Sequence, residues 1–204
     1  IIMNCALFIA NYFVPLRPMS NDRKISVVIN TYNAELHLEQ VIDAVKDFDE
    51  VLVCDMESTD STVEIAQRLG CRIMTFPKAG HSIVEPARQA AIREAKYEWV
   101  LVVDADELVT RQLHDYLYER IGDDNCPEGI AIPRKNYFMD QFLHSAYPDY
   151  VLRFFKRDLT NWPPIIHSSP IIDGRVENIP KGRRELALEI ARSEERRVGK
   201  ECRS

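Results

Sequence analysis

Residues 99–107 read Trp-Val-Leu-Val-Val-Asp-Ala-Asp-Glu, an apolar run that ends in closely spaced acidic residues. The five apolar residues from Trp99 to Val103 are typical of a strand that is buried on both faces of a sheet. Asp104 and Asp106 follow, separated by Ala105. Burying carboxylates near apolar surface is costly unless a cation neutralises them, and Mg²⁺ and Mn²⁺ prefer oxygen ligands. The stretch predicts a buried strand with two metal-binding carboxylates at its end; the alternative is two solvated acids in a loop.

The residues around this stretch alternate between short apolar runs and helical patterns. Runs that predict buried strands lie at 25–29 and 51–54, and a further strand is predicted at 71–76, before Pro77. Segments that predict helices lie at 35–48, 61–69, 83–95 and 112–121. The second helix opens with Ser61-Thr62-Val63-Glu64, which has the form of a capping box. Because strands that alternate with helices form parallel βαβ units, we expect an α/β fold: a Rossmann-like, mostly parallel sheet with helices on both faces.

Polar residues follow these strands where such a sheet binds ligands, beyond the carboxyl ends of its strands. Thr31-Tyr32-Asn33 follows the first strand, Asp55 the second, and the acidic pair the fourth. Asp55 can accept hydrogen bonds from a nucleotide base or ribose, or it can stabilise a turn. Asp60 is expected to cap the helix that follows it. We therefore expect three polar clusters to converge on one edge of the sheet.

The C-terminal half of the chain is less regular. Residues 130–133 and 151–155 predict strands, and much of the remainder up to Lys181 predicts loop. In residues 182–204, 12 of 23 residues are charged, which predicts a solvated helix or a disordered tail without a functional site. We expect a domain at 19–181 that is incomplete at its C-terminus, followed by a charged tail at 182–204 that could be foreign to the fold.

The first residues, Ile1 to Val14, are mostly apolar. The run is too short to cross a bilayer, which takes roughly 20 residues, and no basic region of a signal peptide precedes it. Residues 1–18 are either a membrane-contacting leader or a non-native extension upstream of a natural start at Met19. We favour the extension.

The composition narrows the class of protein. The length of 204 residues suits one domain. A net charge of −6 argues against a general nucleic-acid binder, which carries a basic patch, but it leaves open a small nucleotide bound with a metal ion. The five cysteines include no Cys-x-x-Cys pair, and Cys54 and Cys71 lie in apolar runs. Neither a disulfide framework nor a zinc site is expected, and a reducing cytosol fits best.

Three motifs in this order resemble the family 2 inverting glycosyltransferases, which have the GT-A fold. The motifs are Ile29-Asn30-Thr31-Tyr32-Asn33, the segment from Asp55 to Asp60, and Asp104-Ala105-Asp106. The family's usual second motif is Asp-Asp-Gly-Ser-x-Asp. Here Met56 and Glu57 replace its second Asp and its Gly, and some relatives of the lipopolysaccharide-core glucosyltransferases likewise keep only the first Asp. The resemblance is good over 24–107 and looser over 147–181.

The resemblance implies roles for individual residues. Those implied to line the nucleotide pocket are Thr31, Tyr32, Glu35 and Asp55. Asp104 would lie near the ribose, and Asp106 would hold a Mg²⁺ or Mn²⁺ ion on the diphosphate. Arg88 matches a basic position that contacts the base or the diphosphate, and an ordinary helix-surface arginine is the alternative.

An inverting transfer also needs a general base for the acceptor hydroxyl. The segment from Tyr147 to Arg153 resembles the family's Glu-Asp pair followed by an apolar stretch and an arginine. Asp149 is thereby implied as the base, although Pro148 stands where the family has Glu, and a surface aspartate in a loop is the alternative. His167 could reach the diphosphate or the metal, but a lone histidine is more often structural.

The implied reaction is a single displacement. The donor would be a UDP-sugar, with UDP-glucose the guess from the family. The acceptor would be a saccharide or a lipid-linked glycan, with a peripheral contact at the inner face of the cytoplasmic membrane left open.

Three other readings stay open. A haloacid dehalogenase-like phosphatase also uses Asp-x-Asp after a strand, but its motif lies near the domain start and has Thr or Val where Leu108 stands here. A sugar-phosphate nucleotidyltransferase would need a glycine-rich phosphate loop, and none follows Ile29 in a chain with only seven glycines. A fragment that binds a nucleotide-sugar without turnover is the third reading.

Overall fold

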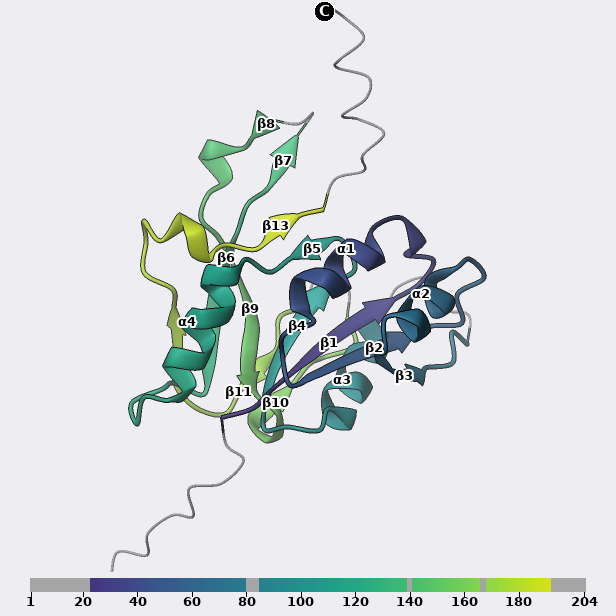
Figure 1. Ribbon diagram of the computed structural model, residues 1–204. Coiled ribbons are helices and arrows are strands. Elements are labelled where there is room, and N and C mark those ends of the chain that lie inside the picture. The colour runs from purple at the N-terminus through teal and green to yellow at the C-terminus, as the bar shows by residue number, and fades with distance from the viewer. Residues whose placement is uncertain (1–22, 80–84, 139–140, 166–167, 192–204) are drawn as a thin grey trace, which may run out of the picture.

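The structure, a computed structural model, describes residues 23–79, 85–138, 141–165 and 168–191. In this part of the chain a seven-stranded sheet has the order β12-β6-β9-β4-β1-β2-β3 (Figure 1). Its strands are β1 (Ile25–Thr31), β2 (Glu50–Asp55), β3 (Arg72–Thr75), β4 (Trp99–Asp104), β6 (Gly129–Arg134), β9 (Asp149–Lys156) and β12 (Val176–Asn178). Strands β3, β2, β1 and β4 are parallel, and β9 runs antiparallel to both β4 and β6. The predicted mostly parallel α/β sheet is confirmed.

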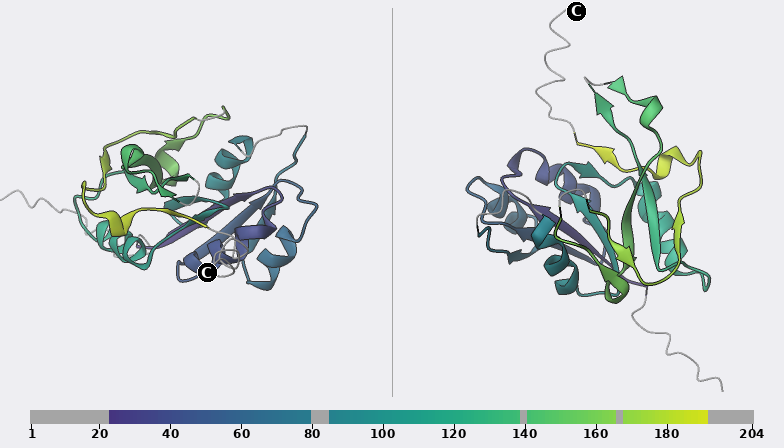
Figure 2. Two further views of the ribbon diagram at one scale, coloured as in Figure 1. Left: turned by 90° about the horizontal axis from the view of Figure 1, so that it is seen from above. Right: turned by 180° about the vertical axis from the view of Figure 1, so that it is seen from behind.

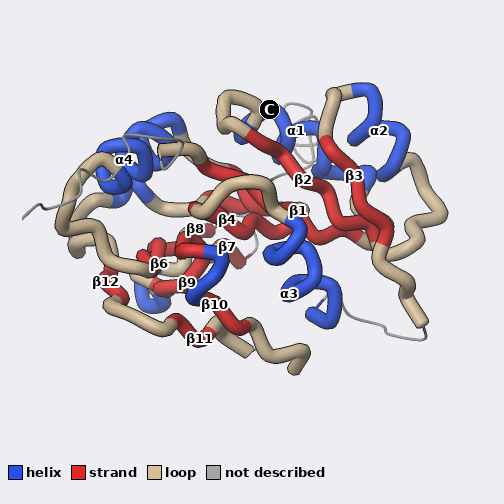
Figure 3. Tube along the Cα trace, turned by 90° about the horizontal axis from the view of Figure 1, so that it is seen from below, coloured by secondary structure: helices blue, strands red, loops and turns tan. Residues whose placement is uncertain are grey.

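Helices cover both faces of the sheet, as predicted. The helices are α1 (Glu35–Val45), α2 (Thr62–Arg68), α3 (Glu85–Glu94) and α4 (Arg111–Ile121). Figure 3 shows α1, α2 and α4 on one side of the sheet and α3 on the other. Each side has its own apolar core: Leu38, Val41 and Leu113 pack on the first, and Ala87, Ala91 and Ile92 on the second. Apolar residues at helical spacing are buried because each helix turns one stripe toward the sheet.

The start of α2 differs from the predicted capping box. Ser61 is the N-cap residue, but its side chain makes no capping hydrogen bond. Instead Asp60 Oδ1 accepts from the Thr62 amide at 3.0 Å, and Asp60 Oδ2 accepts from the Glu35 amide at 3.1 Å. Asp60 therefore caps α2, as expected of it, and also the start of α1, because the two helix N-termini lie side by side at the carboxyl ends of β1 and β2.

Short elements complete the fold, and those between residues 137 and 172 lie in the region expected to be mostly loop. They are β5 (Glu107–Leu108), β7 (Tyr137–Phe138), β8 (Gln141–Phe142), β10 (Thr160–Asn161), β11 (Ile171–Ile172), β13 (Glu189–Ile190) and three single-turn 3₁₀ helices, His144–Ala146, Arg157–Leu159 and Arg184–Leu186. The hairpin of β7 and β8 projects beyond the same end of the sheet at which β5 and β13 lie (Figures 1 and 2). Two-residue strands lack the length that produces a readable alternation, so the sequence gives no signal for them.

Residues 184–191 correct the expectation of a solvated tail. Leu186, Ala187 and Leu188 are at most 1% exposed, and Leu186 and Leu188 belong to the core on the α1 side of the sheet. Strand β13 pairs with β5, which directly follows the acidic motif, Asp104-Ala105-Asp106. The charged residues misled the prediction, because three consecutive apolar residues within a charged segment are enough to anchor it. Residues 192–204 and the apolar stretch from Ile1 to Val14 lie outside the described residues.

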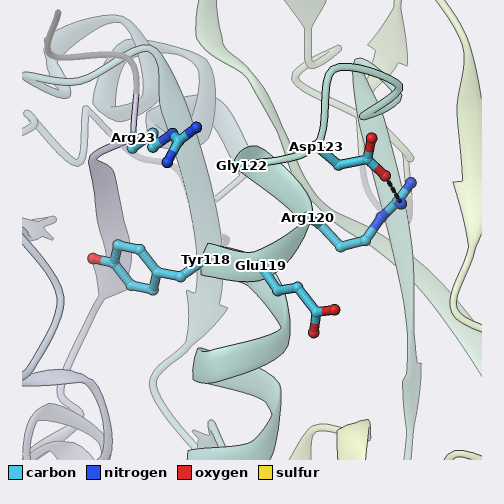
Figure 4. A pocket seen from close by; sticks show the side chains of 6 residues that line it. All are labelled: Arg23, Tyr118, Glu119, Arg120, Gly122 and Asp123. Carbon is cyan, nitrogen blue, oxygen red and sulfur yellow. Dashed lines mark hydrogen bonds and ion pairs between the residues drawn. The ribbon is translucent and has the colours of Figure 1, made fainter. Parts of the chain in front are cut away.

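The described part of the chain contains no helix that is long and apolar enough to cross a membrane. It does contain a cavity of about 490 Å³ lined by Arg23, Tyr118, Glu119, Arg120, Gly122 and Asp123 (Figure 4). These residues precede β1 or end α4, so the cavity lies at the amino edge of the parallel strands. Because ligands of such sheets bind at the carboxyl edge, this cavity is not the candidate site.

Candidate active site

The predicted polar clusters come together at the carboxyl edge of the sheet. In the parallel register Thr31 lies beside Asp55, and Asn30 lies beside Asp104. The strand ends of β1, β2 and β4 thus place these groups in a row, since neighbouring parallel strands end at the same edge. The convergence expected from the strand order is confirmed.

Asp104 is held by two buried arginines. Arg88 Nη2, from α3, donates to Asp104 Oδ1 at 2.8 Å. Arg153, from β9, donates to both oxygens, with Nη1 at 3.3 Å from Oδ1. Burial opposes the charge of Asp104, but the two guanidinium groups prevail and lower its pKa. Arg88, expected to contact the nucleotide, thus contacts the carboxylate expected near the ribose, and it is 7% exposed rather than a surface arginine.

Arg153 reaches Asp104 from a β-bulge. In the pairing of β6 with β9, Ile130 faces Phe154 and the next residue, Ala131, faces Leu152, so Arg153 has no partner. A bulge of this kind bends a strand and changes the direction of a side chain, and it is common next to active sites. Arg153 is the last residue of the segment from Tyr147 that resembles the family's sequence, but no pattern in the sequence reveals the bulge.

The two arginines flank a buried tryptophan that the sequence analysis missed. The guanidinium of Arg88 lies 4.9 Å from the ring centre of Trp162, and that of Arg153 lies 5.8 Å away. Trp162 is 4% exposed. The ring attracts both guanidinium groups through cation–π contacts, and both groups bind Asp104. The Asn-Trp-Pro-Pro segment that carries Trp162 gives no signal of this role.

Glu107 is a buried carboxylate next to Asp104 and Asp106, and no role was predicted for it from the sequence. It is 1% exposed and accepts a hydrogen bond from the Asp104 amide at 3.1 Å. Arg153 Nη2 lies 3.6 Å from its Oε1, and Arg134 Nη1 lies 3.4 Å from the same atom. Burial raises the pKa of Glu107, and the nearby charge of Asp104 adds to this.

Asp106 differs from its acidic neighbours because its side chain is uncommitted. The residue is exposed, and its carboxylate contacts no other side chain or amide of the described residues. Only its backbone carbonyl is bonded, to the Ala191 amide at 2.6 Å. No group of three or more His, Cys, Asp or Glu in the described chain could hold a metal ion. A cation at Asp106 would therefore need ligands from a substrate, and the free carboxylate fits that arrangement.

Asp149 begins β9 opposite Arg134, the last residue of β6. Its Oδ2 accepts from Arg134 Nη2 at 2.8 Å, from Arg134 Nε at 3.2 Å and from Asn136 Nδ2 at 2.8 Å. Its Oδ1 has no partner among the described residues. Partial burial opposes ionisation, but the hydrogen bonds from Asn136 and Arg134 and the charge of Arg134 lower the pKa of Asp149. The carboxylate is thus ionised with one oxygen available.

The residues expected around the nucleotide divide into two groups. Asp55 is 2% exposed and fully engaged: Oδ1 accepts from Thr31 Oγ1 at 3.0 Å and from Ser58 Oγ at 2.5 Å, and Oδ2 accepts from the Ser58 amide at 2.9 Å. Glu35 points to α2, where its carboxylate accepts from the Ser61 amide at 3.0 Å. The hydrogen bond between Asp55 and Thr31 thus links the carboxyl ends of β1 and β2, while Glu35 links the start of α1 to the start of α2.

Tyr32 contacts a cation that the sequence analysis missed. Lys78 Nζ lies 3.7 Å from the ring centre of Tyr32 and also donates to its hydroxyl. Lys78 follows β3 just past its carboxyl end, at the same edge as Asp55, so its position after a strand was the available signal. His167 lies outside the described residues.

Several buried polar atoms have no partner at this edge. Both carboxamide atoms of Asn30, Nε and Nη1 of Arg88, and Nε1 of Trp162 are buried, and none of them has a hydrogen-bond partner among the described residues. These three side chains lie toward the α3 side of the sheet, where Val28, Val102 and Trp162 share one core. An unsatisfied buried polar atom is destabilising, so these atoms lower the free energy of unfolding.

Comparisons with known proteins bear on the same site. The sequence pattern of the family described as Glycosyl transferase family 2 matches residues 26–171. An uncharacterized glycosyltransferase of Rickettsia bellii is 40% identical over 96 residues, which are 46% of this chain and 31% of that protein. The match thus spans about a third of that relative's length.

Two solved structures share the fold. The crystal structure of residues 1–349 of Staphylococcus aureus TarS superposes with a TM-score of 0.60 at 18% identity, covering 82% of this chain and 60% of that one. Glucosyl-3-phosphoglycerate synthase from Mycobacterium tuberculosis, in complex with Mn²⁺, UDP-glucose and phosphoglyceric acid, superposes with a TM-score of 0.51 at 19% identity, covering 67% and 58%. At these identities the likeness concerns the fold.

Proposed function

The chain belongs to glycosyl transferase family 2, and on that premise we propose that it transfers a sugar from a nucleotide-sugar donor to a hydroxyl of a saccharide or lipid-linked acceptor. The donor is a UDP-sugar, the transfer inverts the anomeric centre, and a divalent cation, Mg²⁺ or Mn²⁺, assists it. The solved relative that holds Mn²⁺ with UDP-glucose supports this choice of donor and metal.

The observation that carries the proposal is the contrast between Asp104 and Asp106. The carboxylate of Asp104 is neutralised by Arg88 and Arg153, whereas the carboxylate of Asp106 in the same turn is exposed and has no partner among the described residues. A carboxylate that is fixed by the fold suits a hydroxyl-bearing ligand such as a ribose. A free carboxylate suits a cation, which supplies positive charge to a departing diphosphate.

The chain's own residues would bind the base and the phosphates of the donor. Tyr32 and Lys78 present a ring and a cation after β1 and β3, which suits a base and its attached phosphates. Asp55 keeps the edge in shape through Thr31 and Ser58.

Asp149 is the proposed general base. Its Oδ2 is occupied by Arg134 and Asn136, so Oδ1 would accept the proton of the acceptor hydroxyl. Its lowered pKa makes it ionised but weakly basic. Proton transfer is then late, as the oxygen bonds to the anomeric carbon and the hydroxyl becomes acidic.

The phosphatase alternative is not favoured. In that chemistry the first aspartate of the motif acts as a nucleophile, and here that residue, Asp104, is bonded to two guanidinium groups that reduce its nucleophilicity. A nucleotide-sugar-binding chain without turnover is separated from the proposed enzyme by the experiment below.

The test is calorimetric titration of UDP and UDP-glucose, with and without Mn²⁺, on the wild type and on Asp106→Ala. Asp124→Ala is the matched control, since Asp124 is also exposed and contacts no other charged side chain of the described residues, but follows α4 at the opposite edge. We expect metal-dependent UDP binding that is lost in Asp106→Ala and kept in Asp124→Ala. No UDP binding under any condition would contradict the UDP-sugar donor. Binding without transfer to any acceptor would favour the inactive fragment.

A further inference from the structure

Charged side chains alternate in a continuous line from the acidic motif to the proposed base. Arg153 bridges Asp104 and Glu107, with its Nη2 3.6 Å from Glu107 Oε1. Arg134 then bridges Glu107 at 3.4 Å and Asp149 at 2.8 Å. Arg134 is thus the group that joins the acidic motif at the end of β4 to the start of β9.

We propose that Arg134 is a positioning residue for the general base: it fixes Oδ2 of Asp149, leaves Oδ1 directed to the acceptor hydroxyl, and ties Asp149 to the acidic motif through Glu107. The proposal rests on the proposed function. It assigns to Arg134 a role that no motif in the sequence indicates.

The geometry supports a fixed orientation. Arg134 and Asp149 are cross-strand partners in the β6–β9 ladder. Two nitrogens of one planar guanidinium, Nε and Nη2, bind the same oxygen at 3.2 and 2.8 Å, and Asn136 binds it at 2.8 Å. The guanidinium cannot follow a rotating carboxylate, because its Nη1 also contacts buried Glu107.

The charge around Asp149 is simple. Arg134 from β6 is the only charged side chain of the described residues that contacts it, Asn136 is neutral, and Glu107 of β5 lies on the far side of Arg134. The nearby cation Lys135 is bonded to Glu189 of β13 instead. Removing the charge of Arg134 would leave the burial of Asp149, which raises its pKa.

The experiment compares Arg134→Gln, Arg134→Lys and the control Lys135→Gln. Lys135 neighbours Arg134 and also forms a partly buried ion pair, but with Glu189 rather than with the site. The readouts are kcat/KM as a function of pH, the Kd for UDP with Mn²⁺, and a titration of the Asp149 carboxyl by NMR, which needs no turnover.

We expect Arg134→Gln to lower kcat about 10- to 100-fold, the loss typical of a displaced catalytic group, with the Kd for UDP unchanged. The acid limb of kcat/KM and the NMR titration of Asp149 both move to higher pH, less in Arg134→Lys, and neither moves in Lys135→Gln. A uniform fall in activity with no movement of either titration would overturn the proposal.

Two further results remain decisive. If Arg134→Gln does not fold, Arg134→Lys keeps the charge and supplies the same comparison. If the wild type transfers no sugar, the proposed function fails. The NMR titration then decides the positioning claim alone, and an unchanged Asp149 titration in Arg134→Lys and Arg134→Gln would refute it.

Discussion

Arg153 donates hydrogen bonds to both carboxylate oxygens of Asp104, and it does so from a residue that has no partner in the strand ladder. The bulge directs the guanidinium to the end of β4. The ion pair of Arg153 with Asp104 therefore links β9 to β4. Because Arg153 lies over Trp162 and is bonded to Asp104, the turn that carries Asp106 begins from a fixed residue.

Arg153→Ala is expected to destabilise the protein. Arg88 still neutralises Asp104, but Glu107 and Asp104 both lose a buried cation, and removing one partner of a buried pair costs about 3 kcal/mol or more. Urea denaturation measures the loss. Arg68→Ala, which removes an ion pair with Glu39 between largely exposed side chains, should cost less than about 1 kcal/mol. Equal losses in the two variants would mean that the Arg153 contacts contribute no more than a surface pair.

Asn30→Leu is expected to give a protein at least as stable as the wild type. Both polar atoms of Asn30 are buried and have no partner in the part of the chain that the structure describes, and replacing such a group by an apolar one of similar shape removes a penalty of about 1–3 kcal/mol. Thermal unfolding measures the difference. Asn30→Asp, which buries a charge in the same place, should instead lower the melting temperature. A clear loss of stability in Asn30→Leu would indicate that the carboxamide has a partner in solution.

The parallel half of the fold and the place of the site could be predicted from the sequence. Strands β1, β2 and β4 are mostly apolar, and each ends in a polar residue, so strand order and parallel direction suffice to bring Asp55 and Asp104 to one edge. Local pattern determines these elements, because each buries side chains on both faces of the sheet.

The supporting residues could not be predicted, because their positions depend on non-local pairing. Arg134 meets Asp149 through the register of β6 with β9, and Arg153 meets Asp104 through a bulge in the same ladder. Trp162 reaches Arg88 across the second core. None of these contacts leaves a period in the sequence. The charged composition of 182–204 also concealed the apolar anchor within it.

Leu188→Ala is expected to destabilise the protein by about 2–4 kcal/mol, the usual cost of a large-to-small substitution in a core. Leu188 is fully buried although it lies in a charged segment, and its backbone bonds to Pro133 and Lys135 at the end of β6. Leu36→Ala is the control, because Leu36 is 65% exposed, and it should change stability by less than about 0.5 kcal/mol. Equal stability of the two variants would show that the segment does not pack on the core in solution.

Asp149→Asn is expected to separate chemistry from donor binding. The amide keeps the size of the side chain but cannot accept a proton, so kcat should fall about 10²- to 10⁴-fold, while the Kd for UDP with Mn²⁺ stays unchanged. Asp106→Ala should instead weaken UDP binding, because it removes the proposed contact with the metal ion. Single-turnover assays and calorimetry on both variants measure the two effects. Loss of UDP binding in Asp149→Asn would remove it from the role of base.

The pH profile of the wild type provides a second check on the same residue. A carboxylate can act as the proposed base only when it is ionised, and the pKa of Asp149 is lowered by the bonds from Asn136 and Arg134 against the effect of partial burial. Activity that depends on it should therefore persist as the pH falls through the ordinary range of an aspartate, and be lost only below that range. The stability that these bonds contribute has the same sign: it is present above the pKa of the unfolded chain and lost as the pH falls through the lowered pKa of the folded one. An acid limb of kcat/KM near or above neutral pH would point to a different base, because the surroundings of Asp149 shift its ionisation in the opposite direction.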